Sequence, residues 1–134
     1  RPVSATATTL PWRLSNSSKY MKYTIDATGR VPGRIATEVA VLLMGKNRTD
    51  FAKNTIPAVE VEVVSANAMV LDRKKLKDKK YARHSLYPGG LTLESMAHVV
   101  ATKGNKEVLR RAVYGMLPKN KLRPRMMKNL KIKD

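Results

Sequence analysis

The chain has 134 residues, with 27 Lys and Arg against 10 Asp and Glu, which gives a net charge of +17. It has no cysteine, which excludes disulfides, thiolate-bound zinc and thiol catalysis. Two histidines argue against an all-histidine metal site, and no run of about 18 apolar residues is present to span a membrane. A charge this positive predicts a polyanionic partner, and nucleic acid ahead of an acidic membrane.

The positive charge is concentrated in the second half of the chain. Residues 1–67 have 9 basic and 5 acidic side chains, a net charge of +4, whereas residues 68–134 have 18 and 5, a net charge of +13. Solubility does not require such an excess, so we expect the partner to bind mainly to the second half. With 43% hydrophobic residues, the chain can bury a core, and its length predicts one domain with extensions.

The first 18 residues differ in composition from the rest. They contain two Arg, no acidic residue and many Ser, Thr, Ala and Pro, and such a segment buries too little apolar surface to fold alone. We expect residues 1–18 to form a flexible arm, with Trp12 as its anchor, and residues 19–134 to form the domain. This composition is typical of organelle transit peptides, and a start at Arg1 fits a processed end. An ordinary extension explains the segment equally well.

The first half of the domain predicts a strand, a helix and a second strand. Residues 23–27 predict a short buried strand. Residues 34–44 predict a helix that ends at Gly45, because its apolar side chains recur at helical spacing; they are Ile35, Val39, Leu42 and Leu43. Residues 59–67 alternate before becoming apolar, as a half-buried strand does, and residues 69–71 extend this unit or begin another strand.

The second half predicts a basic excursion followed by two helices. Residues 73–83 contain seven basic residues and one acid and predict an exposed loop or hairpin. Residues 91–101 predict a helix that ends near Gly104, with His98 at its boundary or in the core. Residues 105–116 predict a second helix with Asn105 as its N-cap. The apolar face of this helix consists of Val108, Leu109, Ala112, Val113 and Met116.

The predicted second helix stops at Pro118, and Gly115 near its end would let a neighbouring backbone or an RNA phosphate approach closely. From about residue 118 we expect a basic tail, with seven basic residues in 119–133. The succession of strand, helix, strand, basic excursion and two helices favours an α/β fold with a largely parallel sheet. An α+β arrangement is the alternative.

The two basic clusters and the turn between them predict an RNA-binding surface. Arg side chains form forked hydrogen bonds to phosphate, whereas Lys acts as a point charge. Gly89 and Gly90 allow close backbone approach, while His84 and Tyr87 can stack or donate hydrogen bonds. The alternative is a solvated charged face with a turn that carries incidental polar groups.

The sequence offers little for an enzyme. Neither G-x-G-x-x-G nor the P-loop pattern is present, and Glu60 and Glu62 share one strand face without an adjacent catalytic partner. They are expected to be solvated or paired with Lys and Arg. The remaining enzymatic hypothesis is a nucleic-acid-modifying activity that uses His84 and an acid. We expect no catalytic residue, no metal and no cofactor.

Three segments resemble the signatures of one family, in order. They are IDATGRVPGRIATEVAVLLMGK (residues 25–46), KKYARHSLYPGG (residues 79–90) and AVYGMLPKNKLRPR (residues 112–125), and they resemble the universal large-subunit ribosomal protein L13 family. The resemblance implies a small three-layer α/β/α domain that binds large-subunit ribosomal RNA during assembly. It also implies neighbouring ribosomal proteins as partners and no catalysis. A free RNA-binding or regulatory protein is the alternative.

Sequence and resemblance together predict a set of RNA-facing residues: Arg34, Lys46, Arg48, Arg73, Lys74, Lys75, Lys77, Lys79, Lys80, Arg83, His84, Tyr87, Gly89, Gly90, Gly115, Lys119, Asn120, Lys121, Arg123, Arg125 and Lys128. The chain departs from the family pattern at Pro57-Ala58, where a Gly-Asp turn is usual, and at residues 71–76, where a Thr-Gly-x-Lys-like turn is common. These departures, with the acid-poor arm, favour a mitochondrial ribosome in the matrix over a plastid or bacterial one.

Overall fold

Three parallel strands form the sheet of this protein, whose computed structural model describes residues 21–134. They are β1 (Met21–Asp26), β2 (Val59–Val64) and β5 (Leu130–Ile132), in the order β1-β2-β5. This confirms the predicted α/β class with a parallel sheet. The predicted arm of residues 1–18, with Trp12, lies outside the described residues.

The central strand shows why one face of the sheet is buried. Val59, Val61 and Val63 are fully buried, while the alternate Glu60 and Glu62 are partly exposed on the other face. On that face Glu60 pairs with Lys131 (Nζ to Oε1, 3.3 Å), and Glu62 pairs with Lys133, as the sequence led us to expect. The predicted strand ends early, because the chain turns at Ser65 (φ 60°) into a 3-10 helix, η1 (Ala66–Ala68).

Helix α1 (Pro32–Met44) matches the predicted helix. Ile35, Val39 and Leu43 are buried on its core face, whereas Leu42 is half-buried. Gly45 ends the helix with φ 72°, a left-handed conformation that glycine adopts without the cost of a Cβ. Its N–H donates to the carbonyl of Leu42 (3.0 Å) and the next N–H donates to Val41 (3.1 Å), which closes the last turn.

The basic excursion is more ordered than predicted. Its first part is a short helix, α2 (Arg73–Asp78), which Asp72 caps by accepting from the N–H of Lys74 (3.1 Å). The predicted hairpin is present, formed by β3 (Lys80–His84) and β4 (Leu91–Ser95) as antiparallel partners. The expectation of a helix from residue 91 was therefore wrong, because LTLES pairs with β3 and this cross-strand pairing overrides its local helical pattern.

Helix α3 (Met96–Met116) contains the break that the sequence predicted, at Gly104 (φ 76°, ψ 178°). Before the break His98 is exposed, which corrects its expected core or boundary position. After it, Val108, Leu109 and Val113 are buried and Ala112 is half-buried, whereas Met116 is 43% exposed. Leu117, only 2% exposed, packs into the core instead, because the chain leaves helical geometry there.

The expected basic tail is part of the folded body. Helix α4 (Arg123–Lys128) buries Met126, and β5 then joins the sheet beside β2. The N–H of Lys133 donates to the carbonyl of Val63 (2.8 Å) and continues this pairing. The apolar side chains of Met126, Met127, Leu130 and Ile132 pack in or against the core and so bring this end of the chain back to it.

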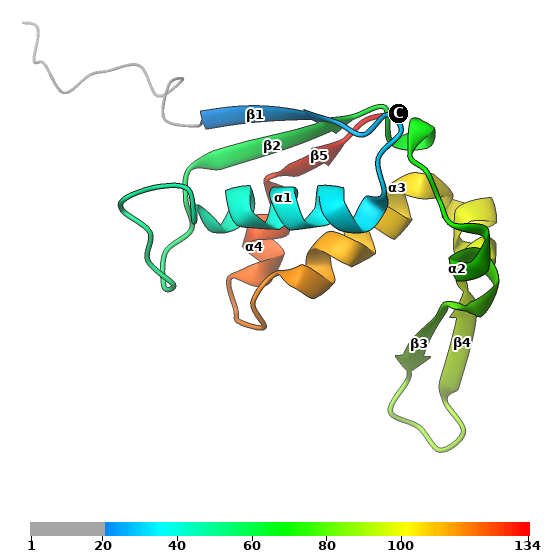
Figure 1. Ribbon diagram of the computed structural model, residues 1–134. Coiled ribbons are helices and arrows are strands. Elements are labelled where there is room, and N and C mark those ends of the chain that lie inside the picture. Colours follow the sequence, from blue (N-terminus) through cyan, green and yellow to red (C-terminus); the bar gives the residue numbers. More distant parts are fainter. Residues whose placement is uncertain (1–20) are drawn as a thin grey trace, which may run out of the picture.

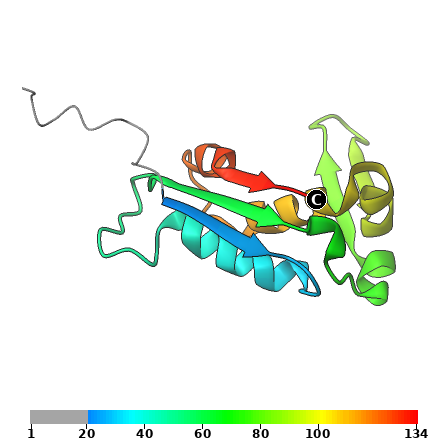
Figure 2. The same cartoon turned by 90° about the horizontal axis from the view of Figure 1, so that it is seen from above.

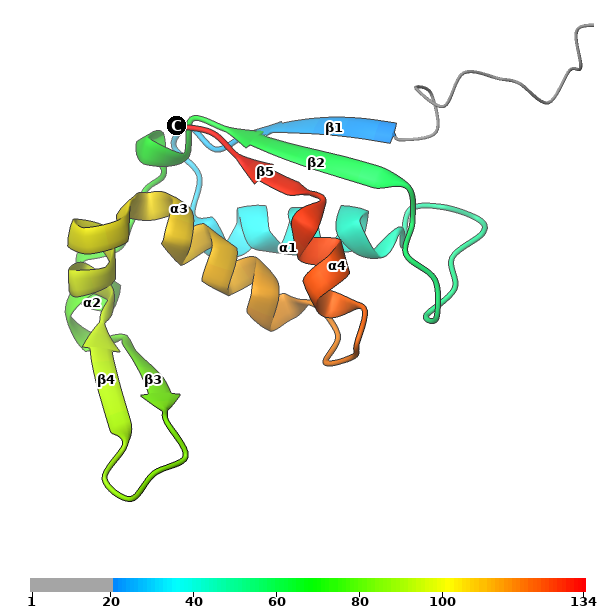
Figure 3. The same cartoon turned by 180° about the vertical axis from the view of Figure 1, so that it is seen from behind.

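The helices α1, α3 and α4 lie on one face of the sheet, as Figure 1 and the view from behind in Figure 3 show. Seen from above in Figure 2, the strands pass over these helices. In residues 21–134 the helices thus cover one face of the sheet, and the other face carries the paired charges of Glu60 and Glu62. Within residues 21–134 no helix is long and apolar enough to cross a membrane.

Candidate nucleic-acid interface

Ion pairs divide the cations of the protein into two populations. Of the 24 Lys and Arg side chains in residues 21–134, eight pair with carboxylates: Lys22, Arg30, Arg48, Lys106, Arg110, Arg111, Lys131 and Lys133. Sixteen described cations make no such pair. Twelve of them belong to two segments, seven to residues 73–83 and five to residues 119–128. Three quarters of the unpaired described cations therefore lie in the two segments, and the other four are Arg34, Lys46, Lys53 and Lys103.

Both segments lie away from the exposed face of the sheet. In Figures 1 and 3 the β3–β4 hairpin and the loop before α4 extend from the helical layer in the direction opposite to the sheet. The sheet face holds Glu60 and Glu62 with their lysine partners, and the hydrogen bond and charge of Lys133 lower the pKa of Glu62. An anion would meet unpaired cations on the helical side and compensated charges on the sheet side.

A small second core supports the hairpin. Met96, Val99 and Val108 of α3 are buried together, and four partly buried side chains pack against them: Leu71, Leu76, Tyr81 and Val100. Leu76 belongs to α2, so this core holds α2 against α3 and leaves its Lys74, Lys75 and Lys77 exposed. Arg73, Lys79, Lys80 and Arg83 are exposed as well.

The tip of the hairpin is shaped by His84 and Gly90. The N–H of Leu86 donates to Nδ1 of His84 (2.9 Å), which leaves Nε2 as the donor of the ring. A Cβ on Gly90 would lie 2.0 Å from Oγ of Ser85 and 2.9 Å from the carbonyl of Tyr87, so this turn requires glycine. Among the described residues no carboxylate is hydrogen-bonded to His84, so the enzymatic hypothesis gains no acid partner there.

Arg111 holds the hairpin against α3. Its guanidinium donates to Glu107 on its own helix (3.0 Å) and to Glu94 of β4 (3.4 Å), and it lies over the ring of Tyr81 of β3 at 4.7 Å. Burial alone would lower the pKa of Arg111, but the hydrogen bonds and charges of the two glutamates outweigh burial and raise it. Burial raises the pKa of Tyr81. One side chain therefore links both hairpin strands to the body.

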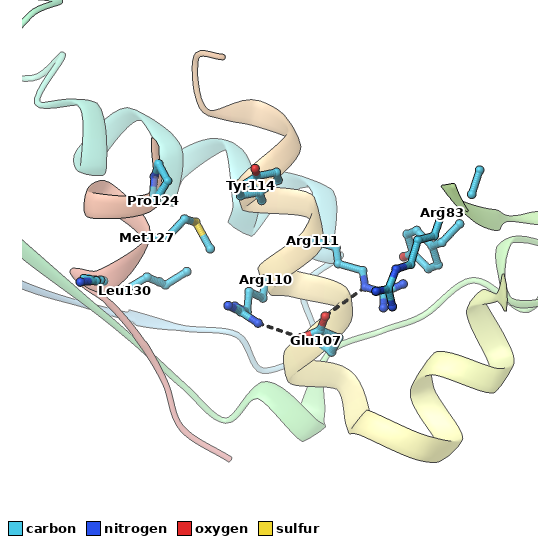
Figure 4. A pocket seen from close by; sticks show the side chains of 11 residues that line it. Arg83, Glu107, Arg110, Arg111, Tyr114, Pro124, Met127 and Leu130 are labelled. Carbon is cyan, nitrogen blue, oxygen red and sulfur yellow. Dashed lines mark hydrogen bonds and ion pairs between the residues drawn. The ribbon is translucent and has the colours of Figure 1, made fainter. Parts of the chain in front are cut away.

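A groove of about 970 Å³ lies between the hairpin and the α3–α4 unit. Tyr81, Ala82 and Arg83 line it from β3, and side chains of α3, α4 and β5 line the rest, as Figure 4 shows; these are Glu107, Arg110, Arg111, Tyr114, Pro124, Met127, Lys128 and Leu130. Arg83 and Lys128 were predicted from the sequence as RNA-facing, whereas Arg110 and Tyr114 were not. Both lie on the face of α3 opposite its buried residues, so helical spacing from Leu109 and Val113 could have found them.

The segment before α4 is fixed by its own contacts. Arg123 lies over the ring of Tyr114 at 4.4 Å, and its Nε donates to the carbonyl of Pro118 (3.0 Å). Asn120 accepts from the N–H of Leu122 (3.1 Å). Four other predicted RNA-facing cations of residues 119–128 are exposed: Lys119, Lys121, Arg125 and Lys128. Lys119 and Lys121 lie in the loop, and Arg125 and Lys128 lie on α4.

The remaining predicted RNA-facing residues lie in other settings. Arg34 is exposed on α1 and Lys46 follows its end, whereas Arg48 forms a forked pair with Asp50 (3.1 and 2.9 Å). A Cβ on Gly115 would meet nothing within 4 Å, so no neighbouring backbone explains that glycine. Contact with RNA stays a prediction for each of them.

Within residues 21–134 no group of His, Asp and Glu side chains is arranged to hold a metal ion. Most of the described carboxylates are engaged instead in ion pairs, turns or a helix cap. Arg30 donates to Glu38 and lowers its pKa, and the N–H and hydroxyl of Thr28 lower the pKa of Asp26. Through its spaced positive charges and a few aromatic side chains, this surface can bind an anion.

Comparison with known proteins agrees with the three sequence signatures. The model of the family described as Ribosomal protein L13 matches residues 20–133. The protein named large ribosomal subunit protein uL13 of Pelotomaculum thermopropionicum is 44% identical over 110 residues, which cover 82% of this chain and 76% of the relative. Its namesakes in Citrifermentans bemidjiense and Psychrobacter arcticus are 46% and 41% identical, over 82% of this chain and 77% of each relative. The chain belongs to the ribosomal protein L13 family.

Proposed function

We propose that this chain is a structural component of the large ribosomal subunit and binds ribosomal RNA through its unpaired cations. The observation that carries the proposal is that twelve of the sixteen described Lys and Arg side chains without an ion pair lie in residues 73–83 and 119–128, on the side opposite the sheet face. Contacts from such side chains to phosphate position a protein without reading the base sequence. The expected target is therefore a folded RNA, recognised by shape, and the role is structural.

Salt dependence of RNA binding tests this proposal. Lys121→Gln/Arg125→Gln removes two exposed cations that make no ion pair with described residues, and Lys22→Gln/Lys131→Gln removes two cations that pair with Glu60 on the sheet face. Both double variants lose the same charge. Binding of transcribed large-subunit ribosomal RNA is measured between 50 and 200 mM salt, as is usual for counterion release.

We expect the first variant to reduce the log–log slope by roughly 0.7–0.9 for each lost phosphate contact, and the second to leave it unchanged. Equal slopes in the two variants would mean that bulk charge alone drives binding. Sedimentation of cell extract on a density gradient adds the assembly test. A protein that does not travel with large subunits would favour the alternative, a free RNA-binding protein.

For the compartment, we propose the mitochondrial ribosome, on the composition of residues 1–18, which are acid-poor and rich in Ser and Thr. The relatives reported above are bacterial, so a bacterial cytoplasm is the competing outcome. Fractionation of source cells, followed by detection of the protein in organelle or cytosolic large subunits, separates the two.

Neighbouring large-subunit proteins are the second class of partner that we propose. The hairpin supports this, because four of its apolar side chains are more than half exposed: Leu86, Tyr87, Leu91 and Leu93. Leu86 also has φ 69°, a conformation that leucine rarely adopts. Chemical cross-linking of intact large subunits should connect this hairpin to another protein, and cross-links to RNA alone would argue against that role.

A further inference from the structure

The groove beside the hairpin differs from the rest of the cationic surface, because apolar and aromatic side chains accompany its charges. Pro124, Met127 and Leu130 form one wall, and Tyr114 and Arg110 of α3 lie beside it, as Figure 4 shows. Phosphate contacts alone need no apolar wall. Unpaired bases do, since they bind by stacking on aromatic and apolar surfaces beside basic groups.

The charges that line the groove favour an anion. Its basic side chains are Arg83, Arg110, Arg111 and Lys128, against the single acid Glu107. Glu107 is already bound by Arg111 at 3.0 Å, which leaves it little free charge to repel a phosphate. Arg110 is the more exposed and more loosely paired of the two arginines, because its side chain is 65% exposed and lies 3.5 Å from Glu107.

We propose that this groove binds one unpaired nucleotide of the RNA, with the base against Tyr114 and Met127 and the phosphate between Arg110 and Arg83. The inference rests on the proposed function, of which it names one RNA element. The volume of about 970 Å³ lies at the upper end of the range of about 300–1,000 Å³ that small-molecule sites occupy. It therefore admits a nucleotide.

Two stem–loop RNAs that differ by a single unpaired adenosine in the stem provide the test. The full-length protein should bind the RNA with the unpaired base about tenfold more tightly, within the range that stacking on an aromatic side chain contributes. Tyr114→Ala should abolish the preference. Tyr114→Phe, which keeps the ring, and Phe51→Ala, which removes an exposed ring that does not line the groove, should both retain it.

A second measurement locates the base directly. With 5-iodouridine at the unpaired position, irradiation should attach the RNA to a peptide that contains Tyr114 or Met127. Attachment to residues 84–91, or an unchanged preference in Tyr114→Ala, would overturn the inference. If both RNAs still bound with a steep salt dependence in that case, the proposed function would stand. If the unmodified protein bound neither RNA in a salt-dependent way, the proposed function would be refuted, and this inference with it.

Discussion

Arg111→Ala removes a side chain of α3 that contacts both strands of the hairpin. The pair with Glu107 is an i,i+4 pair at 3.0 Å, worth about 0.3–0.5 kcal/mol, and the pair with Glu94 at 3.4 Å is worth about 0.2–1 kcal/mol. The stack on Tyr81 at 4.7 Å is worth about 0.5–1 kcal/mol. These side chains are at most one-third exposed, so solvent screening is incomplete, and we expect a loss of about 1–2 kcal/mol.

This loss should act on the hairpin before it acts on the sheet, because the contacts lie outside the main core. Native-state hydrogen exchange should show the amides of β3 exchanging about 5–30 times faster in Arg111→Ala, while those of β2 are unchanged. The matched control is Arg110→Ala, whose one ion pair is 3.5 Å long on a side chain that is 65% exposed. We expect no change there. If the amides of β3 exchanged equally fast in Arg111→Ala and in the unmodified protein, Arg111 would not be what holds the hairpin against α3.

Three further predictions concern stability. Leu109→Ala, at a fully buried position, should cost about 2–5 kcal/mol in urea unfolding, and a loss below about 1 kcal/mol would contradict the core described here. Gly45→Ala should cost about 1 kcal/mol or more, because φ is +72° and the new Cβ would lie 3.0 Å from Cβ of Pro57; an unchanged Tm would show that this turn relaxes freely. The Glu62–Lys133 pair should stabilise the fold at neutral pH. Lys133 lowers the pKa of Glu62 from the ordinary value of 4.5, so the folded state takes up that proton less readily than the unfolded chain, and the contribution is lost as the pH falls from 4.5 through the lowered value. Glu62→Gln should therefore reduce the acid sensitivity of the urea midpoint, and an identical pH profile would exclude the pair as a contributor.

Local sequence predicted the elements whose pattern and tertiary setting agree. In α1 the spacing of Ile35, Val39 and Leu43 matches the buried stripe, and Gly45 ends the helix as expected. The alternation of Val59, Val61 and Val63 likewise matches the buried face of β2. At Gly104 the break in α3 falls where the glycine indicated it. In each of these elements the conformation that the local sequence favours is also the one that the tertiary structure requires.

The hairpin shows where local pattern was insufficient. Residues 91–95 have helix-compatible composition, yet they form β4 because β3 offers a hydrogen-bonding partner that a helix prediction does not consider. The same applies to residues 130–132, which were assigned to a tail. Their pairing partner, β2, lies about seventy residues earlier in the chain, and no local window contains it.

The candidate site divides in the same way. Clusters of Lys and Arg were visible in the sequence, and their members in residues 73–83 and 119–128 make no ion pair with described residues, as a polyanion-binding surface requires, whereas Lys131 and Lys133 are paired. Which cations are neutralised was not visible, because pairing depends on distant carboxylates; Arg111 finds Glu94 across seventeen positions, and Lys131 finds Glu60 across seventy-one.

The sequence by itself determined the charge, its concentration in the second half, the α/β class and, through three signatures, the family. Those properties follow from composition and from residues close together in the chain. Tertiary structure alone decided that the sheet has one covered face, that residues 130–132 complete it, and that Arg83 and Arg110 line one groove with Tyr114. These depend on side chains brought together from β3, α3, α4 and β5, since burial and ion pairing are settled by neighbours in space.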